Sequence, residues 1–144
     1  MIQAQRSKAY MAIVPQKITD GATATARVDT KGYSYATLFL QTSAEEGTDA
    51  GNATLGVLEA DVTDVSSFAT IVANQSVDNT AAKQTRYDID LRSRKRYLRL
   101  TMTAASVTGS DLIVAGMAVL SRGSAGPAST ADEVYSTNDA VVVV

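Results

Sequence analysis

Alternation of apolar and polar residues is the dominant pattern along this chain. In segment 96–104, apolar residues occupy every second position from Leu98 to Ala104, and polar residues fill the positions between them. A period of two places successive side chains on opposite faces of a β-strand. Segment 86–92 follows the same rule, with Tyr87 and Ile89 on one face and charged residues on the other. Both segments therefore predict strands with one buried and one exposed face.

The same reasoning extends to an all-β fold. The short link 93–95 predicts a β-hairpin between these two strands, although it lacks the Gly or Asn of a tight two-residue turn. Segment 33–42 is apolar on both faces near Leu38, which predicts a central strand, and one helical turn is expected at 62–67. Further strands are predicted at 9–14, 22–28, 54–62, 68–72 and 112–120. Eight short strands indicate a single-domain antiparallel β-sandwich or jelly-roll-like barrel with extended terminal arms.

The two ends of the chain differ from this middle part. Residues 1–8 are polar and predict an N-terminal arm, followed by the β-domain at 9–121. Residues 122–144 begin as a Ser, Gly, Ala and Pro-rich linker and predict a C-terminal arm. The arm ends in a β-prone run, Val141, Val142, Val143 and Val144. Such a run is an aggregation hazard if exposed, so it forms either a final edge strand of its own domain or an insertion beside a neighbouring subunit.

Segment 112–120 differs from the half-buried strands because it is apolar on both faces. One face fills the core, and the other needs cover from a further layer or from another subunit. We favour a subunit contact. The candidate oligomer or capsid interface residues are Leu112, Val114, Met117 and Val119, together with the terminal valines 141–144.

The amino-acid composition excludes several classes of functional site. The 144 residues include no Cys and no His, which excludes disulfides, thiolate metal sites and Ser-His-Asp or Cys-His catalysis. Glu45, Glu46 and Asp49 share one loop, but adjacent acids in a turn are more often solvated surface than a glycosidase or calcium site. The longest apolar stretch is too short to cross a bilayer. We therefore expect no catalytic, cofactor or metal site and no membrane partner.

The strongest local charge feature is a basic cluster around the predicted hairpin. Its members are Arg86, Arg92, Arg94, Lys95, Arg96 and Arg99. Three interpretations remain open: internal pairing with Asp88 and Asp90, an interface with an acidic protein surface, or binding to phosphates. Direct nucleic-acid binding is not expected, because Tyr97 alone is available for stacking on bases and the formal net charge is −2.

Three segments carry a resemblance to a known family. They are PQKITDG at 15–21, VDTKGYSYAT at 28–37 and DIDLRSRKRYLRL at 88–100. In order and spacing, the chain over about 9–120 resembles short structural proteins encoded among the head genes of tailed phages. The resemblance implies a capsid decoration, or cement, protein, which is a small β-domain that binds the outside of the major capsid protein shell, commonly as a trimer. It brings no catalytic motif.

These observations together predict a non-enzymatic virion structural protein. It would be synthesised in the cytoplasm of a bacterial host and would then decorate and stabilise the outer capsid surface through the major capsid protein. We expect a homo-oligomer, with a trimer favoured over a dimer. The alternatives are another phage head-completion or tail-associated structural protein, or a carbohydrate- or host-surface-binding β-module. A sugar platform would have to come from Tyr33, Tyr35 or Tyr97.

Overall fold

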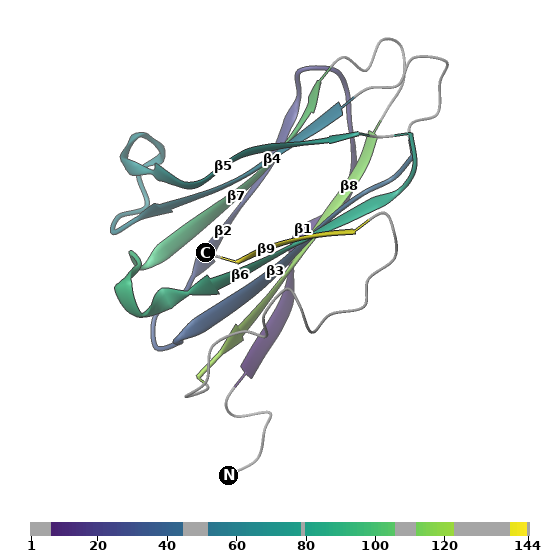
Figure 1. Cartoon of the computed structure of the whole chain (residues 1–144). Helices are drawn as coiled ribbons and strands as arrows, with labels where there is room; N and C mark the ends of the chain where they lie inside the picture. The colour runs from purple at the N-terminus through teal and green to yellow at the C-terminus, as the bar shows by residue number, and fades with distance from the viewer. Residues whose placement is uncertain (1–6, 45–51, 79, 106–111, 123–138, 144) are drawn as a thin grey trace.

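The computed structural model of the chain describes residues 7–44, 52–78, 80–105, 112–122 and 139–143 (Figure 1). Two β-sheets face each other. Sheet A has the strand order β1-β8-β3-β6-β9, and sheet B has the order β2-β7-β4-β5. The strands are β1 (Ser7–Ile18), β2 (Thr23–Asp29), β3 (Tyr35–Thr42), β4 (Asn52–Ala60), β5 (Ala69–Asp78), β6 (Lys83–Asp90), β7 (Tyr97–Ala105), β8 (Leu112–Ser121) and β9 (Asp139–Val143).

The connectivity of the first eight strands is that of a jelly roll. The first strand pairs with the eighth and the third with the sixth in sheet A, while the second pairs with the seventh and the fourth with the fifth in sheet B. All of these pairs are antiparallel. This nested order confirms the predicted all-β sandwich and selects the jelly roll among the predicted variants. The central position predicted for segment 33–42 is also confirmed, because β3 lies between β8 and β6.

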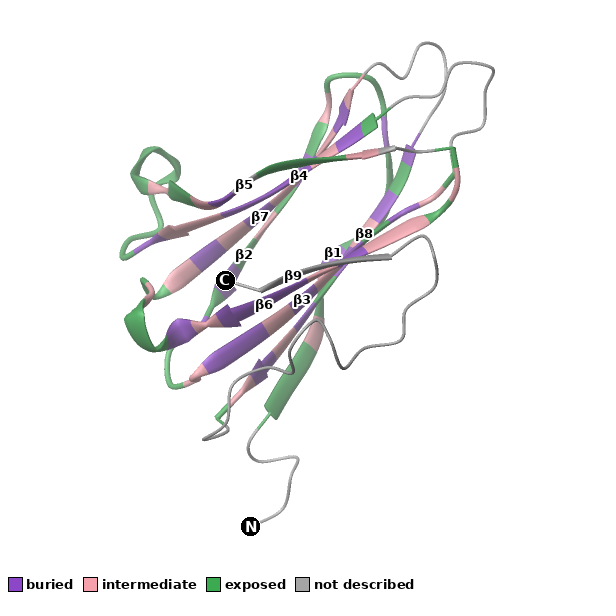
Figure 2. Ribbon diagram, viewed as in Figure 1, coloured by how far each residue is buried: buried purple, intermediate pink, exposed green. Residues whose placement is uncertain are grey.

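The core lies between the two sheets and follows the alternation seen in the sequence (Figure 2). Along β7, Leu98, Leu100 and Met102 are fully buried, while the residues between them are partly exposed. From β6, Tyr87 and Ile89 enter the same core. Each fully buried aliphatic side chain stabilises the fold by about 1.5–3 kcal/mol, so these inward faces hold the two sheets together.

The predicted hairpin between segments 86–92 and 96–104 is wrong. Strand β6 belongs to sheet A and β7 to sheet B, so their apolar faces meet across the core instead of lying side by side in one sheet. The link contains the short 3-10 helix η3 (Leu91–Ser93), whose first turn is capped by the Asp90 side chain accepting from the Arg92 backbone N–H at 3.0 Å. Alternation reports which face of a strand is buried, and it does not report the partner strand.

Strand β9 occupies the edge of sheet A beside β6. It runs parallel to β6, with Val141 opposite Arg86 and Val143 opposite Asp88. The backbone of the terminal valine run therefore forms an edge strand of its own domain, which is the first of the two interpretations left open by the sequence. Val144 lies outside the described residues.

Candidate interaction surface

The outer face of sheet A carries large apolar side chains that the fold leaves uncovered. In the described part of the chain, six large apolar side chains are exposed, and four of them, Met11, Val14, Ile113 and Met117, belong to β1 and β8. Met11 lies opposite Met117, and Met117 lies opposite Phe39 of β3, so the two methionines and the ring form one row across three strands. We call Met11, Val14, Phe39, Ile113, Met117 and Val119 the apolar face.

The apolar face arises because β8 carries apolar residues on both of its faces from Leu112 to Leu120. Leu112 and Val114 point into the core and are fully buried, whereas Ile113 and Met117 are 45% and 38% exposed. The sequence grouped Leu112, Val114, Met117 and Val119 as one interface. The structure divides them, with Leu112 and Val114 in the core and Met117 and Val119 on the opposite side of the strand.

Met11 and Val14 were not identified from the sequence. Strand β1 changes register between Met11 and Ile13 and again between Ile13 and Gln16 in its pairing with β8. Such bulges add residues to one strand, which breaks the period of two. As a result Ile13 is buried while Met11 and Val14, three positions apart, are both exposed. An irregular alternation at 9–18 was the available signal.

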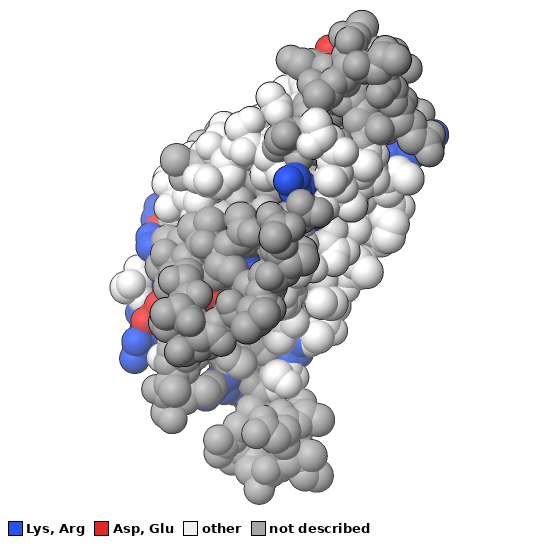
Figure 3. All heavy atoms as spheres, turned by 45° about the vertical axis from the view of Figure 1, so that its right-hand side comes forward, with Lys and Arg blue, Asp and Glu red and all other residues white. Residues whose placement is uncertain are grey.

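The surface over these strands is poor in charge. Strand β8 contains no charged residue, and β1 contains only Lys8 and Lys17. In the space-filling view, most of the described surface on this side is uncharged, and acidic and basic side chains gather mainly toward its margins (Figure 3). An exposed apolar patch with a polar rim is characteristic of a site that contacts another molecule.

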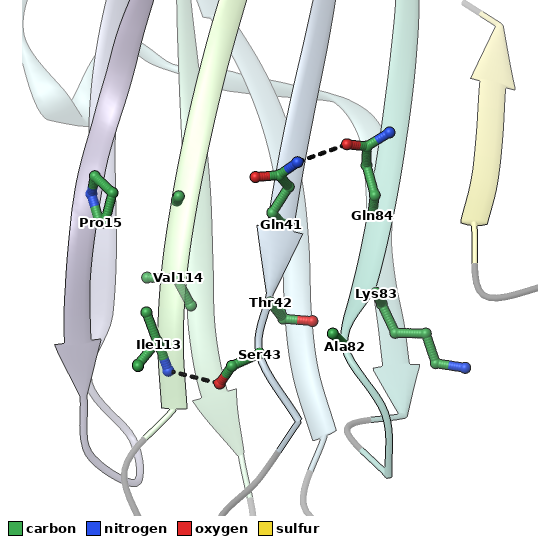
Figure 4. Close-up of a pocket in the computed structure, with 10 residues that line it drawn as sticks. Pro15, Gln41, Thr42, Ser43, Ala82, Lys83, Gln84, Ile113 and Val114 are labelled. Carbon is green, nitrogen blue, oxygen red and sulfur yellow. Dashed lines mark hydrogen bonds between the residues drawn. The ribbon is translucent and has the colours of Figure 1, made fainter. Parts of the chain in front are cut away.

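A groove of about 460 Å³ continues the apolar face toward one end of sheet A (Figure 4). Its apolar side is formed by Pro15, Ile113 and Ala115, and its other side by Gln41 and Gln84 on β3 and β6. The Gln41 side chain donates from Nε2 to Gln84 Oε1 at 2.6 Å, which fixes both amides. Ile113 belongs both to the apolar face and to the groove, so the two features form one continuous surface.

Among the described residues that line the groove, Lys83 is the one charged side chain, and no carboxylate accompanies it. General acid-base catalysis requires a positioned proton donor or acceptor, usually tuned by a second group. The described lining offers Lys83 without such a second group. Its apolar and amide side chains can contact a ligand or a polypeptide segment.

Most of the predicted basic cluster is paired within the chain. Arg86 contacts the buried Asp88 at 2.6 Å, and the Arg92 side chain donates from Nε to Asp90 Oδ1 at 2.9 Å. Both pairs join residues two apart on the same strand or at its end. The other partners come from sheet B, where Arg96 pairs with Asp29 at 2.7 Å, Arg94 lies 4.0 Å from Glu59, and the Lys95 backbone N–H donates to Glu59. Arg99 lies instead over the Phe68 ring, 6.0 Å from its centre.

The ion pairs alter the acidity of two carboxyl groups. Hydrogen bonding by Arg96 lowers the pKa of Asp29 to about 2, and hydrogen bonding by Arg92 lowers the pKa of Asp90 to about 2. Both side chains remain more than one third exposed, so these pairs contribute little to stability. Both carboxyl groups are fully ionised at neutral pH and cannot supply protons there.

Tyr87 is a fully buried titratable group of the core. Burial raises its pKa to about 12, and its hydroxyl has no hydrogen-bond partner among the described residues. A phenol with this pKa stays protonated at neutral pH, and its ring is enclosed by the apolar core. Tyr87 therefore acts as a packing residue.

The tyrosines considered for a sugar platform do not form one. The Arg122 guanidinium lies 5.0 Å from the Tyr33 ring centre, and Arg96 lies 4.8 Å from the Tyr97 ring. Tyr35 is buried and has Arg92 over its ring at 5.3 Å. One face of each ring is thus occupied by a guanidinium, and Tyr35 and Tyr97 belong to different sheets.

Neither a metal-type cluster of acidic side chains nor a membrane-spanning helix is found among the described residues. Among them, no three Asp or Glu side chains gather in a way that could hold a metal ion. The acidic loop residues Glu45, Glu46 and Asp49 lie outside this part of the chain. In the same described residues, no helix is long and apolar enough to span a membrane.

Comparisons with known proteins identify the fold. No protein-family model matches the chain, and no curated protein sequence matches it. The structure of infectious bursal disease virus Gx strain is similar with a TM-score of 0.53 and 11% identity over 85% of this chain and 34% of that chain. The CBM22-1-GH10 modules of Clostridium thermocellum xylanase 10B, complexed with xylohexaose, give a TM-score of 0.51 and 14% identity over 88% and 27%. The infectious bursal disease virus VP2 subviral particle gives 0.47 and 14% over 85% and 34%.

The chain therefore spans about a third of the viral chains and about a quarter of the xylanase chain. At these identities, the two likenesses with TM-scores above 0.5 show a shared β-sandwich fold. A fold of this kind does not by itself specify a function.

Proposed function

We propose that this protein is a non-enzymatic virion structural protein that decorates and stabilises a phage capsid by binding the major capsid protein shell from outside. The observation that carries the proposal is the apolar face of sheet A with its continuous groove, which the described residues of the jelly-roll sandwich leave exposed. The resemblance of segments 15–21, 28–37 and 88–100 to phage head proteins supports the same assignment.

The apolar face supplies affinity of the kind that a docking surface needs. Met11, Val14, Ile113 and Met117 are each 38–61% exposed, so covering each one contributes on the order of 1 kcal/mol. Four such side chains make one contact of modest strength. The adjoining groove, open and partly apolar, accepts an extended segment of the shell protein and adds to that contact.

Modest single contacts favour an oligomer. When several copies are held together, the later contacts become intramolecular, and the effective concentration raises the overall avidity. A homotrimer that bridges neighbouring capsid subunits would hold them against internal DNA pressure. The proposed location is accordingly the outer capsid surface, after synthesis in the bacterial host.

Two other functions compete with this proposal. A head-completion or tail-associated protein would use the same apolar face, and immunogold labelling of virions would separate it from a decoration protein by position. A carbohydrate- or host-surface-binding module is less supported, because Tyr35 is buried and a guanidinium lies over one face of each of the three tyrosine rings. Glycan-array binding that depends on Gln41 or Gln84 would favour it.

Co-sedimentation with expanded, undecorated capsids tests the proposal. Wild-type protein at micromolar concentration should sediment with the particles, and Met117→Glu should reduce binding at least a hundredfold because it places a charge at the centre of the apolar face. Thr23→Glu is the matched control, since Thr23 is exposed on the outer face of sheet B. Failure of the wild type to sediment, or equal binding by Met117→Glu, would contradict the proposal.

A further inference from the structure

The outer face of sheet B contains two arginines that lie side by side without a carboxylate partner among the described residues. Arg27 of β2 and Arg99 of β7 lie directly opposite each other in the antiparallel pair. Like charges at directly opposed positions destabilise a sheet. Four other arginines of this domain each have a carboxylate within 4.0 Å. Among the described residues, Arg27 and Arg99 form no such ion pair.

The two guanidiniums are held in place by other contacts. Arg27 donates from one terminal nitrogen to the backbone carbonyl of Thr63 at 2.9 Å, and Arg99 lies 6.0 Å from the centre of the Phe68 ring. A guanidinium has five N–H donors, so with respect to the described residues most donors of both side chains are available to a ligand. The nearby Asp64 is engaged differently, since its side chain caps the 3-10 helix η2 (Val65–Ser67) by accepting from the Ser66 backbone N–H.

A small hollow lies between these side chains. Its volume is about 190 Å³, and it is lined by Thr25, Ala26, Arg27, Val65, Phe68 and Arg99. Val65 is 64% exposed, so one wall presents apolar surface while the Arg27 and Arg99 side presents positive charge. The size suits a single side chain, and the two walls suit a group that is both acidic and attached to apolar neighbours.

We propose that this hollow is an acceptor site for a carboxylate side chain of a partner polypeptide, in an acidic segment with apolar flanking residues. Arg recognises carboxylates through paired N–H donors, and an incoming negative charge removes the repulsion between Arg27 and Arg99. A nucleic acid fits less well, because a phosphate backbone needs a track of free basic groups, and most neighbouring arginines already have carboxylate partners. The site lies on the face opposite the proposed capsid contact and does not depend on it.

Peptide titration of the full-length protein tests this site. The probes are acetyl-Leu-Glu-Leu-amide, its Gln counterpart and a short oligothymidylate, followed by backbone amide shifts of β2 and β7. The Glu peptide should bind at least tenfold more tightly than the Gln peptide, and Arg27→Gln/Arg99→Gln should abolish that preference. Arg96→Gln is the matched control and should retain it.

Two further variants and the oligonucleotide make the outcome decisive. Arg27→Lys/Arg99→Lys keeps both charges but loses the paired N–H donors of the guanidinium. It should therefore bind the Glu peptide more weakly than wild type and still prefer it over the Gln peptide. It also provides a folded comparison if the Gln double variant is unstable. Equal binding of the Glu and Gln peptides to wild type, or tighter binding of oligothymidylate that the double variant loses, would overturn the proposal.

Discussion

The two outer faces of this sandwich differ although both sheets bury the same kind of inner face. On sheet A, exposed Met and Ile side chains lie over β1 and β8. On sheet B, Thr23 and Thr103 share a hydroxyl hydrogen bond at 2.8 Å, Thr25 lies opposite Thr101, and Arg27 lies opposite Arg99. Inner faces follow from the need for a core, whereas outer faces are free to vary. This difference underlies both proposals, in which sheet A docks through apolar contact and sheet B recognises negative charge.

The largest expected change in the free energy of unfolding comes from substitutions on the two opposite faces of β8. Leu112→Ala removes a fully buried side chain and should lower the free energy of unfolding by about 3 kcal/mol. Ile113→Ala, one residue away on the apolar face, should change it by less than about 1 kcal/mol. Urea denaturation of both variants measures the contrast. Equal losses would mean that Ile113 is a core residue and that the apolar face does not exist.

Breaking an ion pair of either sheet should lower the free energy of unfolding by a smaller amount. Asp88 on β6 is fully buried beside Arg86 and also accepts from Thr37 Oγ1 at 2.8 Å. Asp88→Asn should lower the free energy of unfolding by about 2 kcal/mol, because it removes the fully buried negative charge from the 2.6 Å ion pair with Arg86.

The control for that change is on sheet B. Asp29→Asn breaks an ion pair in which both side chains are more than 40% exposed, so it should cost less than about 1 kcal/mol. Thermal denaturation at constant ionic strength compares the two. A larger loss in Asp29→Asn than in Asp88→Asn would reverse the assignment of buried and exposed charge.

Buried positions could be predicted from the sequence alone, whereas strand partners could not. The alternation of β6 and β7 correctly placed Tyr87, Ile89, Leu98 and Leu100 in the core, because burial of one strand face is a local property. Strand partners are not local. The hairpin prediction failed for that reason, and the carboxylates that pair with Arg94 and Arg96 come from β4 and β2.

The interaction surface was foreseen only in part for a similar reason. Because β8 is apolar on both faces, the sequence predicted that its outer face contacts another molecule. The register shifts of β1 interrupt its alternation, so the exposure of Met11 and Val14 could not be predicted. Arg27 was missed because its position opposite Arg99 depends on the register of β2 with β7, which composition and periodicity do not specify.

The smallest expected change in stability is the one that follows protonation of Asp29 and Asp90 at acidic pH. The pKa of Asp29 is lowered from an ordinary value of 3.8 to about 2 by the Arg96 hydrogen bond. A carboxyl group with a lowered pKa in the folded state stabilises that state fully above about pH 4, and the contribution is lost as the pH falls toward 2. Asp90 behaves alike, beside Arg92.

Carboxyl NMR titration measures both groups. Arg96→Gln should return the pKa of Asp29 toward 3.8 and leave the pKa of Asp90 low. An Asp29 titration near 3.8 in the wild type would show that the pair does not persist in solution.

A particle image of decorated capsids that resolves the two sheets would show which outer face contacts the shell. We expect β1 and β8 to face the shell, with continuous density between the capsid protein and the side chains of Met11, Ile113 and Met117. The face that carries Arg27 and Arg99 should point away from the shell. Contact of sheet B with the shell, with the apolar face of sheet A open to solvent, would show that the docking surface is wrongly assigned.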